Sequence, residues 1–241
     1  MGALPRYLLL QIRNQDDPMR THEIRCFARA LACEHSKIEV SDLLNEQPSS
    51  AQLARNDLVL IGGSGRYSAA GNGVWLDGAL VALRNLYEIK KPTFGSCWGF
   101  QALSRALGGD VQNDSSAAEL GTQPVTLTDA GRDDPVFGPL GDSFLAPMGH
   151  EDSVIVLPSS AISLATTERC PHQAFCFPDR PMYATQFHPE LTKDDLLERI
   201  RTYPEYIELI SGMTFEKFVE SCREMRESRS ILARFAQHVL Q

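Results

Sequence analysis

Cys97 lies in the stretch KPTFGSCWGFQAL, residues 91–103, between a short apolar run and a helix-forming run. In an open α/β sheet, ligands bind where a strand hands over to a helix. A tight turn at such a junction exposes its side chain to the N–H groups and dipole of the next helix, which favours a thiolate. Gly95 and Gly99 supply the steric room for this turn. The segment indicates a nucleophilic cysteine, although a buried structural cysteine beside closely packed glycines explains it equally well.

A nucleophilic thiol needs a base, and the base needs a group that orients it. The stretch YATQFHPEL, residues 183–191, offers His188 at the end of an apolar run and Glu190 two residues later. Because Pro189 fixes the backbone between them, Glu190 could hold the imidazole tautomer whose other nitrogen faces the sulfur. The spacing alone is weak evidence, since a histidine at a strand end is more often an ordinary hydrogen-bonded residue.

The elements that must position these residues alternate between strands and helices. Short apolar runs that end in polar or glycine residues predict buried parallel strands over 6–12, 57–63 and 92–96. Apolar residues at helical spacing predict helices over 21–35 with a Thr21 cap, over 74–89, and over 99–109 with a closing glycine pair. This order predicts an α/β fold with a mostly parallel central sheet flanked by helices.

After Gly121 the pattern changes to short strands separated by Pro, Gly and Asp turns, at 122–128, 143–149, 153–158, 162–167, 173–177 and 182–187. We expect a later, partly antiparallel strand region packed on the same domain. After Glu190 the chain becomes helical and charged, and Pro204 separates two helices. The expected organisation is one domain over 1–241 with a helical extension at 192–227. The extension either covers the sheet and adds to the core, or roofs the Cys97 pocket or forms an oligomeric or synthetase-docking surface.

Composition excludes several classes of function. A net charge of −8 without any Lys/Arg-rich segment argues against nucleic-acid binding. The apolar run near the N-terminus is too short for a signal peptide or a membrane span, so we expect a cytoplasmic protein without a membrane partner. Six cysteines lack any CxxC pairing, which makes a metal site improbable, and Cys26, Cys33 and Cys222 are expected to be small buried apolar residues. The glycine-rich stretch 63–75 lacks GxxxxGK[ST], so it is not a nucleotide cradle, and no cofactor is expected.

Three stretches together resemble one family. GSCWGFQ fits Cys-x-Gly-x-Gln, QFHPE fits His-Pro-Glu, and LIGGSG lies upstream at a strand end. In this order and at these separations they resemble the class I glutamine amidotransferases, especially free-standing domains like the amidotransferase domain of guanosine-monophosphate synthetase. The resemblance runs from about Tyr7 to Leu191, with a fainter echo in SILARFAQHVL. It implies the flavodoxin-like class I amidotransferase fold.

The resemblance also implies roles for individual residues. Cys97 would attack the side-chain amide of glutamine, His188 would pass the thiol proton to the leaving ammonia, and Glu190 would orient His188. The backbone N–H groups of Gly63 and Trp98 would hold the oxyanion, and such donors are typically worth about 3 kcal/mol each.

Substrate-binding roles follow from the same resemblance. Gln101, one helical turn beyond the cysteine, matches the family's substrate-binding glutamine. The loop MGHEDSV, residues 148–154, corresponds to the loop that grips the amino-acid end of glutamine around His150, Glu151 and Asp152. Many relatives have a small residue where Glu151 stands, and a solvated turn would explain these side chains equally well.

Three functions remain in competition. The leading one is a glutaminase that releases ammonia to a separate synthetase subunit, because no synthetase domain is expected within these residues. The second is a γ-glutamyl hydrolase that uses the same three residues on larger γ-glutamyl amides. The third is a non-catalytic regulatory or docking domain that has kept the fold. The sequence leaves the acceptor and the oligomeric state open, and a homo-oligomer is possible.

Overall fold

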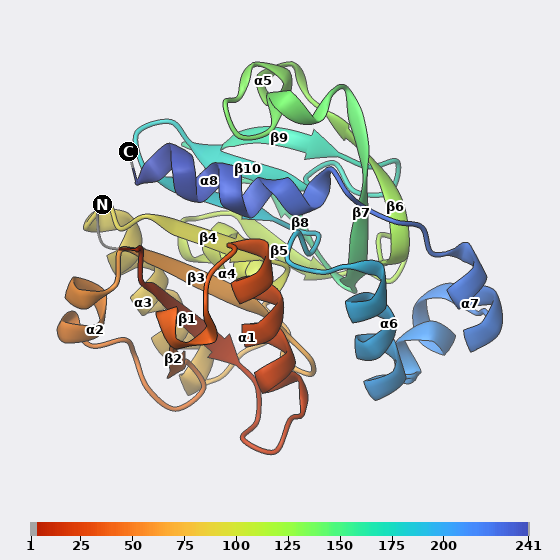
Figure 1. The fold of residues 1–241 in the computed structure, drawn as a ribbon, viewed down its shortest axis with the longest axis horizontal. Helices are drawn as coiled ribbons and strands as arrows, with labels where there is room; N and C mark the ends of the chain where they lie inside the picture. Colours follow the sequence, from red (N-terminus) through yellow and green to blue (C-terminus); the bar gives the residue numbers. More distant parts are fainter. Residues whose placement is uncertain (1–3, 241) are drawn as a thin grey trace.

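The computed structural model describes residues 4–240, in which strands and helices alternate through the first half of the chain (Figure 1). The strands are β1 (Tyr7–Ile12), β2 (Ile38–Asp42), β3 (Leu58–Ser64), β4 (Thr93–Ser96), β5 (Asp110–Asn113), β6 (Glu119–Leu127), β7 (Ser143–His150), β8 (Asp152–Val156), β9 (Ile162–Thr166), β10 (Ala174–Phe177) and β11 (Met182–Thr185). The helices are α1 (Met19–Ala30), α2 (Ser50–Arg55), α3 (Val74–Glu88), α4 (Trp98–Ala106), α5 (Asp129–Asp133), α6 (Lys193–Thr202), α7 (Phe215–Ser221) and α8 (Ile231–Val239). A π-helical turn (Ile207–Ser211) lies between α6 and α7.

Within the described residues, nine strands form one mixed sheet in the order β2-β1-β3-β4-β11-β10-β9-β6-β7. The five strands from β2 to β11 run parallel, and the remaining strands continue the sheet in antiparallel pairs. The predicted α/β class, with a parallel core and later antiparallel strands, is therefore confirmed. The antiparallel strands extend the central sheet, and β5 and β8 form a separate two-stranded sheet.

Both faces of the parallel strands are covered by helices, which explains why these strands are continuous apolar runs. In β1, Leu9 packs in a cluster with residues of α1 and α8, whereas Leu8 and Leu10 pack in a second cluster with residues of α3 and α4. The helix α8 lies over the centre of the sheet, since the ring of Phe235 is 5.3 Å from Phe94 in β4 and 5.4 Å from Tyr183 in β11.

The C-terminal extension packs on α1 and β6 through a third, smaller apolar cluster. This cluster joins Leu196, Ile200 and Phe218 of α6 and α7 to Cys26 in α1 and Leu120 in β6. Helices α6 and α7 therefore add to the core, and in Figure 1 α6 stands beside α1 with α7 on the far side of α6. Among the described residues, no helix has the length and apolar character needed to cross a bilayer.

The structure differs from the sequence prediction in a few elements. The prediction omitted β2, α2, β5 and α5, although a Ser49–Gln52 capping box marks the start of α2. Helix α1 begins at Met19 after Pro18 rather than at a Thr21 cap, so Thr21 lies within the helix. Prolines are well suited to the first turn of a helix because their missing N–H has no intrahelical partner there.

The close contact between α4 and β3 yields the first prediction. A Cβ atom at Gly99 would lie 2.8 Å from both the Cβ and the carbonyl oxygen of Ile61. We expect Gly99→Ala to destabilise the fold by about 1–3 kcal/mol through overpacking. The matched control is Gly78→Ala in α3, where the nearest atom lies 3.5 Å away and alanine should stabilise the helix by up to about 1 kcal/mol. Equal urea midpoints for Gly99→Ala and the unsubstituted protein would contradict the contact.

Candidate active site

Cys97 occupies the sharp turn between β4 and α4. Its backbone has φ 53° and ψ −101°, a conformation that costs energy for any residue other than glycine and is concentrated at functional sites. Its N–H donates to the carbonyl oxygen of Thr185 in β11, at 2.8 Å. The side chain borders a cavity of about 150 Å³. The strained turn and its place at the carboxyl edge of the sheet are the features expected of a nucleophile.

His188 and Glu190 emerge at the same edge because β11 is the parallel neighbour of β4, with Thr185 opposite Ser96. The imidazole Nδ1 of His188 lies 2.8 Å from Oε1 of Glu190. The hydroxyl of Ser96 donates to the other carboxylate oxygen at 2.9 Å. Both His188 and Glu190 are buried, so this hydrogen bond orients the ring within a dry environment.

Cys97 and His188 both lie against the backbone of Gly63 at the end of β3. A Cβ atom at Gly63 would be 2.9 Å from Cε1 of His188 and 3.7 Å from Cβ of Cys97, so a side chain at 63 would enter the space between them. The sulfur lies 3.7 Å from the carbonyl oxygen of Gly149 and 3.9 Å from Nε2 of Gln186. Catalytic hydrogen bonds are often formed only once the substrate is bound.

Burial dominates the protonation states of the three side chains. It raises the pKa of Cys97 to about 12, although Arg199 and the N–H of Trp98 act in the opposite direction. Burial also lowers the pKa of His188. For Glu190, burial acts to raise the pKa, but His188 and Arg199 outweigh it and hold the pKa at about 2. At neutral pH the site therefore contains a thiol, a neutral imidazole and a carboxylate.

The two predicted oxyanion donors differ in their surroundings. The N–H of Trp98 is directed at the sulfur of Cys97, and the indole is buried with its ring 6.0 Å from Trp75. The N–H of Gly63 donates to Oε1 of Glu23 at 3.1 Å. Glu23 must release this N–H before Gly63 can bind an oxyanion.

The predicted substrate-binding residues line the cavity, but the side chains of Gln101 and Asp152 form hydrogen bonds with other residues of the protein. The side-chain amide of Gln101 donates to the carbonyl oxygen of Asp152 at 2.8 Å and to Gln186 at 3.1 Å. The carboxylate of Asp152 accepts from the hydroxyl of Ser68 and from the N–H of Ala69, at 2.6 and 2.9 Å. These contacts fix the glycine-rich loop against β8, whereas Glu151 is only partly buried at the rim.

Sequence reasoning missed two residues of the extension that reach the site. Arg199 of α6 places Nη1 3.1 Å from Nδ1 of His188 and Nη2 3.4 Å from Glu190. Tyr206 lines the cavity and donates its hydroxyl to the carbonyl oxygen of Gly65 at 2.9 Å. The signal for Arg199 was its position three residues after Leu196, which places a charge on the apolar face of α6.

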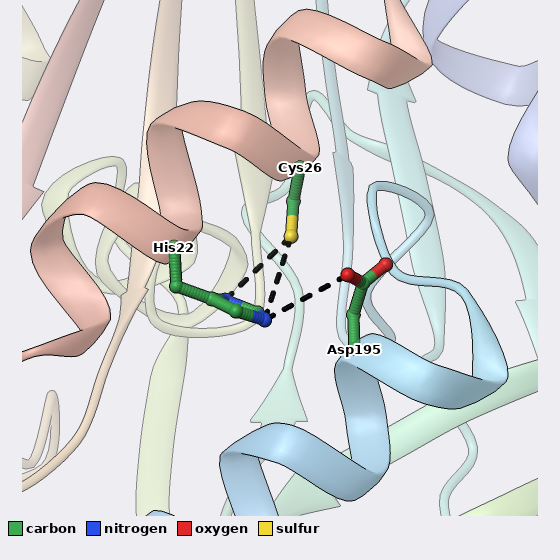
Figure 2. Close-up of side chains that lie close together, drawn as sticks. All are labelled: His22, Cys26 and Asp195. Atoms are coloured by element: carbon green, nitrogen blue, oxygen red, sulfur yellow. Dashed lines mark hydrogen bonds and ion pairs between the residues drawn. The ribbon is translucent and has the colours of Figure 1, made fainter.

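Two buried groups combine side chains of metal-ligand type: His22, Cys26 and Asp195, and Glu119, His150 and Cys170. In the first group, shown in Figure 2, the sulfur lies 3.6 and 3.8 Å from the two ring nitrogens. A metal bound by a ring nitrogen lies along the lone pair of that nitrogen, to one side of the ring. A sulfur almost equidistant from both nitrogens is too far from either such position to bind the same metal. Asp195 is also paired with Arg29, so the group is a polar contact between α1 and α6. In the second group, His150 lies 3.3 Å from Glu119.

A larger hollow, of about 690 Å³, borders β9, β10 and α8 and contains none of the predicted site residues. Size alone therefore does not lead to the residues that the sequence predicts. The smaller cavity beside Cys97 combines the strained cysteine with convergent polar groups, which is the better criterion for a site.

Comparison with known proteins identifies the family. A family model described as Glutamine amidotransferase class-I matches residues 22–198. The chain belongs to the class I glutamine amidotransferase family. Within this family, it is 29% identical over 188 residues to GMP synthase [glutamine-hydrolyzing] of Prochlorococcus marinus, a match that covers 75% of the chain and 33% of the relative. The corresponding protein of Malacoplasma penetrans is 31% identical over 120 residues, which are 50% of the chain and 23% of the relative.

Solved structures of the family share the fold. A glutamine amidotransferase from Thermotoga maritima superposes with a TM-score of 0.77 at 20% identity, over the full length of both chains. A glutamine amidotransferase from Methylobacillus flagellatus has a TM-score of 0.72 at 20% identity, and the match covers 98% of this chain and 95% of the relative. The matched segment thus spans a quarter to a third of the curated relatives, whereas the structural relatives have comparable length.

The buried histidines predict how stability changes with pH. Burial lowers the pKa of His22 to about 4, whereas an unfolded histidine takes up a proton near pH 6.5. The unfolded state therefore binds more protons between these values, and the free energy of unfolding should fall as pH is lowered from 6.5 towards 4. We expect His22→Gln to flatten this slope in urea unfolding curves, and His35→Gln, at an exposed position, to leave it unchanged. An unaltered slope in His22→Gln would contradict the burial of a neutral imidazole.

Proposed function

We propose that this chain hydrolyses the side-chain amide of glutamine through a γ-glutamyl thioester on Cys97. The observation that carries the proposal is the parallel pairing of β4 with β11, which brings His188 and Glu190 to the turn that holds Cys97. Family membership supports glutamine as the substrate. No cofactor is needed, because the thiol, the base and the orienting carboxylate all come from the chain.

In the proposed first step, the thiol rotates from Gly149 towards His188, whose neutral imidazole accepts the proton. The thiolate attacks the amide carbon, and the carbon–oxygen double bond becomes an oxyanion held by the N–H of Trp98. The N–H of Gly63 joins it once Glu23 has released that group. Because the thiol is buried, the proton transfer and the attack must be closely coupled.

The tetrahedral intermediate then collapses with cleavage of the carbon–nitrogen bond. His188 returns its proton to the leaving nitrogen, which departs as ammonia and leaves the thioester on Cys97. A water molecule, deprotonated by His188, attacks the thioester and releases glutamate and the thiol. Throughout this cycle, Glu190 stabilises the transient imidazolium, which is the role of an ionised carboxylate beside the base.

The size of the cavity favours free glutamine over a long γ-glutamyl peptide. The space of about 150 Å³ beside Cys97 suits one amino acid, and Tyr206 and Glu151 are among its lining residues. The ammonia acceptor would be a separate enzyme, as in the leading interpretation of the sequence. The γ-glutamyl hydrolase alternative requires the rim to open for a second residue of the substrate.

Cys97→Ala is expected to abolish amide hydrolysis and leave the fold intact, because a nucleophile and its base act as a unit whose loss costs several orders of magnitude in rate. Glutamine hydrolysis is measured by the glutamate released, with circular dichroism as the test of folding. The control is Cys33→Ala, a partly buried cysteine away from the cavity, which should keep the full rate. Turnover in Cys97→Ala above one hundredth of that rate would rule out the thioester.

Substrate preference distinguishes the two enzymatic alternatives. We expect kcat/KM for glutamine to exceed that for γ-glutamyl dipeptides by at least tenfold, because a cavity of about 150 Å³ has little room for a second residue. Preference for the dipeptides would instead assign the chain as a γ-glutamyl hydrolase.

A glutamine-mimicking diazo-ketone should label Cys97 selectively among the six cysteines, as mapped by mass spectrometry. Preferential labelling of Cys26 or Cys222 would contradict the site itself.

A further inference from the structure

Arg199 is buried beside the His188–Glu190 pair, although it comes from the extension and not from the strands that form the site. Its side chain is only about 9% exposed. Its guanidinium contacts Glu190 at 3.4 Å and approaches Glu23 at 3.9 Å, while Nη1 lies 3.1 Å from Nδ1 of His188. A single cation therefore lies between the carboxylate that orients the imidazole and the carboxylate that holds the N–H of Gly63.

The position of Arg199 is fixed by the way α6 docks on α1. Asp195 closes a capping box with Thr192 at the start of α6 and pairs with Arg29 of α1. His22 lies between Cys26 and Asp195 in the same interface (Figure 2). One turn later along α6, Arg199 points into the site, so the docking of two helices sets where its charge lies.

Two arginines and three carboxylates form the charge network around His188. Glu23 and Glu190 are matched by Arg199 and by Arg13, whose Nη2 lies 3.4 Å from Glu23. Asp17, at the less buried edge, pairs with Arg13 at 3.2 Å. The polar or titratable groups that face this network from the neighbouring elements are Ser96, Cys97, His22, Tyr203 and Tyr206. Without Arg199, the three carboxylates would face Arg13 alone, and protonation of His188 would offset part of the excess negative charge.

The hydrogen bonds at Nδ1 determine which imidazole nitrogen can act as a base. If Nδ1 carries the proton, it donates to Glu190 and leaves the Nε2 lone pair free. If Nδ1 accepts from Arg199, Nε2 carries the proton and cannot receive another from the thiol. The contact to Glu190 is the shorter, at 2.8 Å against 3.1 Å, and its acceptor is an ionised carboxylate. A guanidinium held by Glu190 and Glu23 therefore acts on His188 through its charge.

We propose that Arg199 is a positioning residue of this site, which keeps His188 neutral with its proton on Nδ1 and Nε2 free as the base. The cation is held by the two carboxylates, acts on His188 through its charge, and does not touch the reacting atoms. This inference rests on the proposed function for its catalytic meaning, but the state of His188 can be measured without any substrate. In agreement, burial lowers the pKa of His188, Glu190 raises it, and Arg199 lowers it further.

The test is a pH titration of ¹⁵N-labelled protein by NMR, in which the His188 ring signals are identified by their loss in His188→Gln. Unsubstituted protein should show the Nδ1-protonated neutral ring at pH 7. In Arg199→Met, His188 should become protonated at a pH at least one unit higher, and Arg199→Lys should restore most of the original titration. The matched control is Arg201→Met on the same helix, where the arginine is exposed and lies over the ring of Phe215.

A second measurement follows the rate of Cys97 alkylation by iodoacetamide against pH. Because Arg199 also lowers the pKa of the thiol, its removal should shift the rise in rate to higher pH. If Arg199→Met does not fold, Arg199→Gln, which keeps a polar side chain, takes its place in both experiments.

The outcomes separate this inference from the proposed function. An imidazolium or an Nε2-protonated ring in the unsubstituted protein at pH 7 would overturn the role of Arg199. An unchanged titration of His188 in folded Arg199→Met or Arg199→Gln would overturn it as well. Amide hydrolysis that persists in Cys97→Ala would end the proposed function instead, while the tautomer measured at His188 would remain valid.

Discussion

The parallel pairing of β4 with β11 is the interaction on which the site depends. The two strands are separated by more than eighty residues, yet their register places Ser96 opposite Thr185, so that the turns after both strands meet at one edge of the sheet. The N–H of Cys97 donates to the carbonyl oxygen of Thr185, and this hydrogen bond ties the strained turn to the strand that leads to His188. Contacts within the sheet thus offset the conformational energy of the strained Cys97 backbone, as is usual for strained functional residues.

A buried charge network surrounds this edge and connects parts that come from different elements. Arg13 follows β1, Glu23 lies in α1, Glu190 follows β11, and Arg199 lies in α6. Removing one member of a buried pair leaves an uncompensated charge at high energetic cost, so the network constrains all four elements together. The network also links the predicted oxyanion donor to the predicted base, since Glu23 accepts from the N–H of Gly63 while Glu190 contacts His188.

The C-terminal extension contacts both the core and the cavity beside Cys97. Its apolar side chains pack against Cys26 and Leu120 and enlarge the core. Two other side chains of the extension reach the site, where Tyr206 lines the cavity and Arg199 contacts the His188–Glu190 pair. Core packing and contact with the cavity therefore do not exclude each other in this segment. Whether it also forms a docking surface for another chain remains a hypothesis.

The sequence by itself determined the α/β class, most elements, and Cys97, His188 and Glu190 as candidate residues, because apolar periodicity and short motifs are local signals. It missed β2, whose buried and partly exposed positions do not form a continuous apolar run, and β5, which is mostly exposed. Only the tertiary structure decided that Asp152 holds a loop, that Glu23 occupies the N–H of Gly63, and that Arg199 reaches His188. These contacts join residues 11 to 83 positions apart through the register of the sheet and the docking of α6 on α1. Their geometry depends on packing between distant segments, which no local pattern encodes.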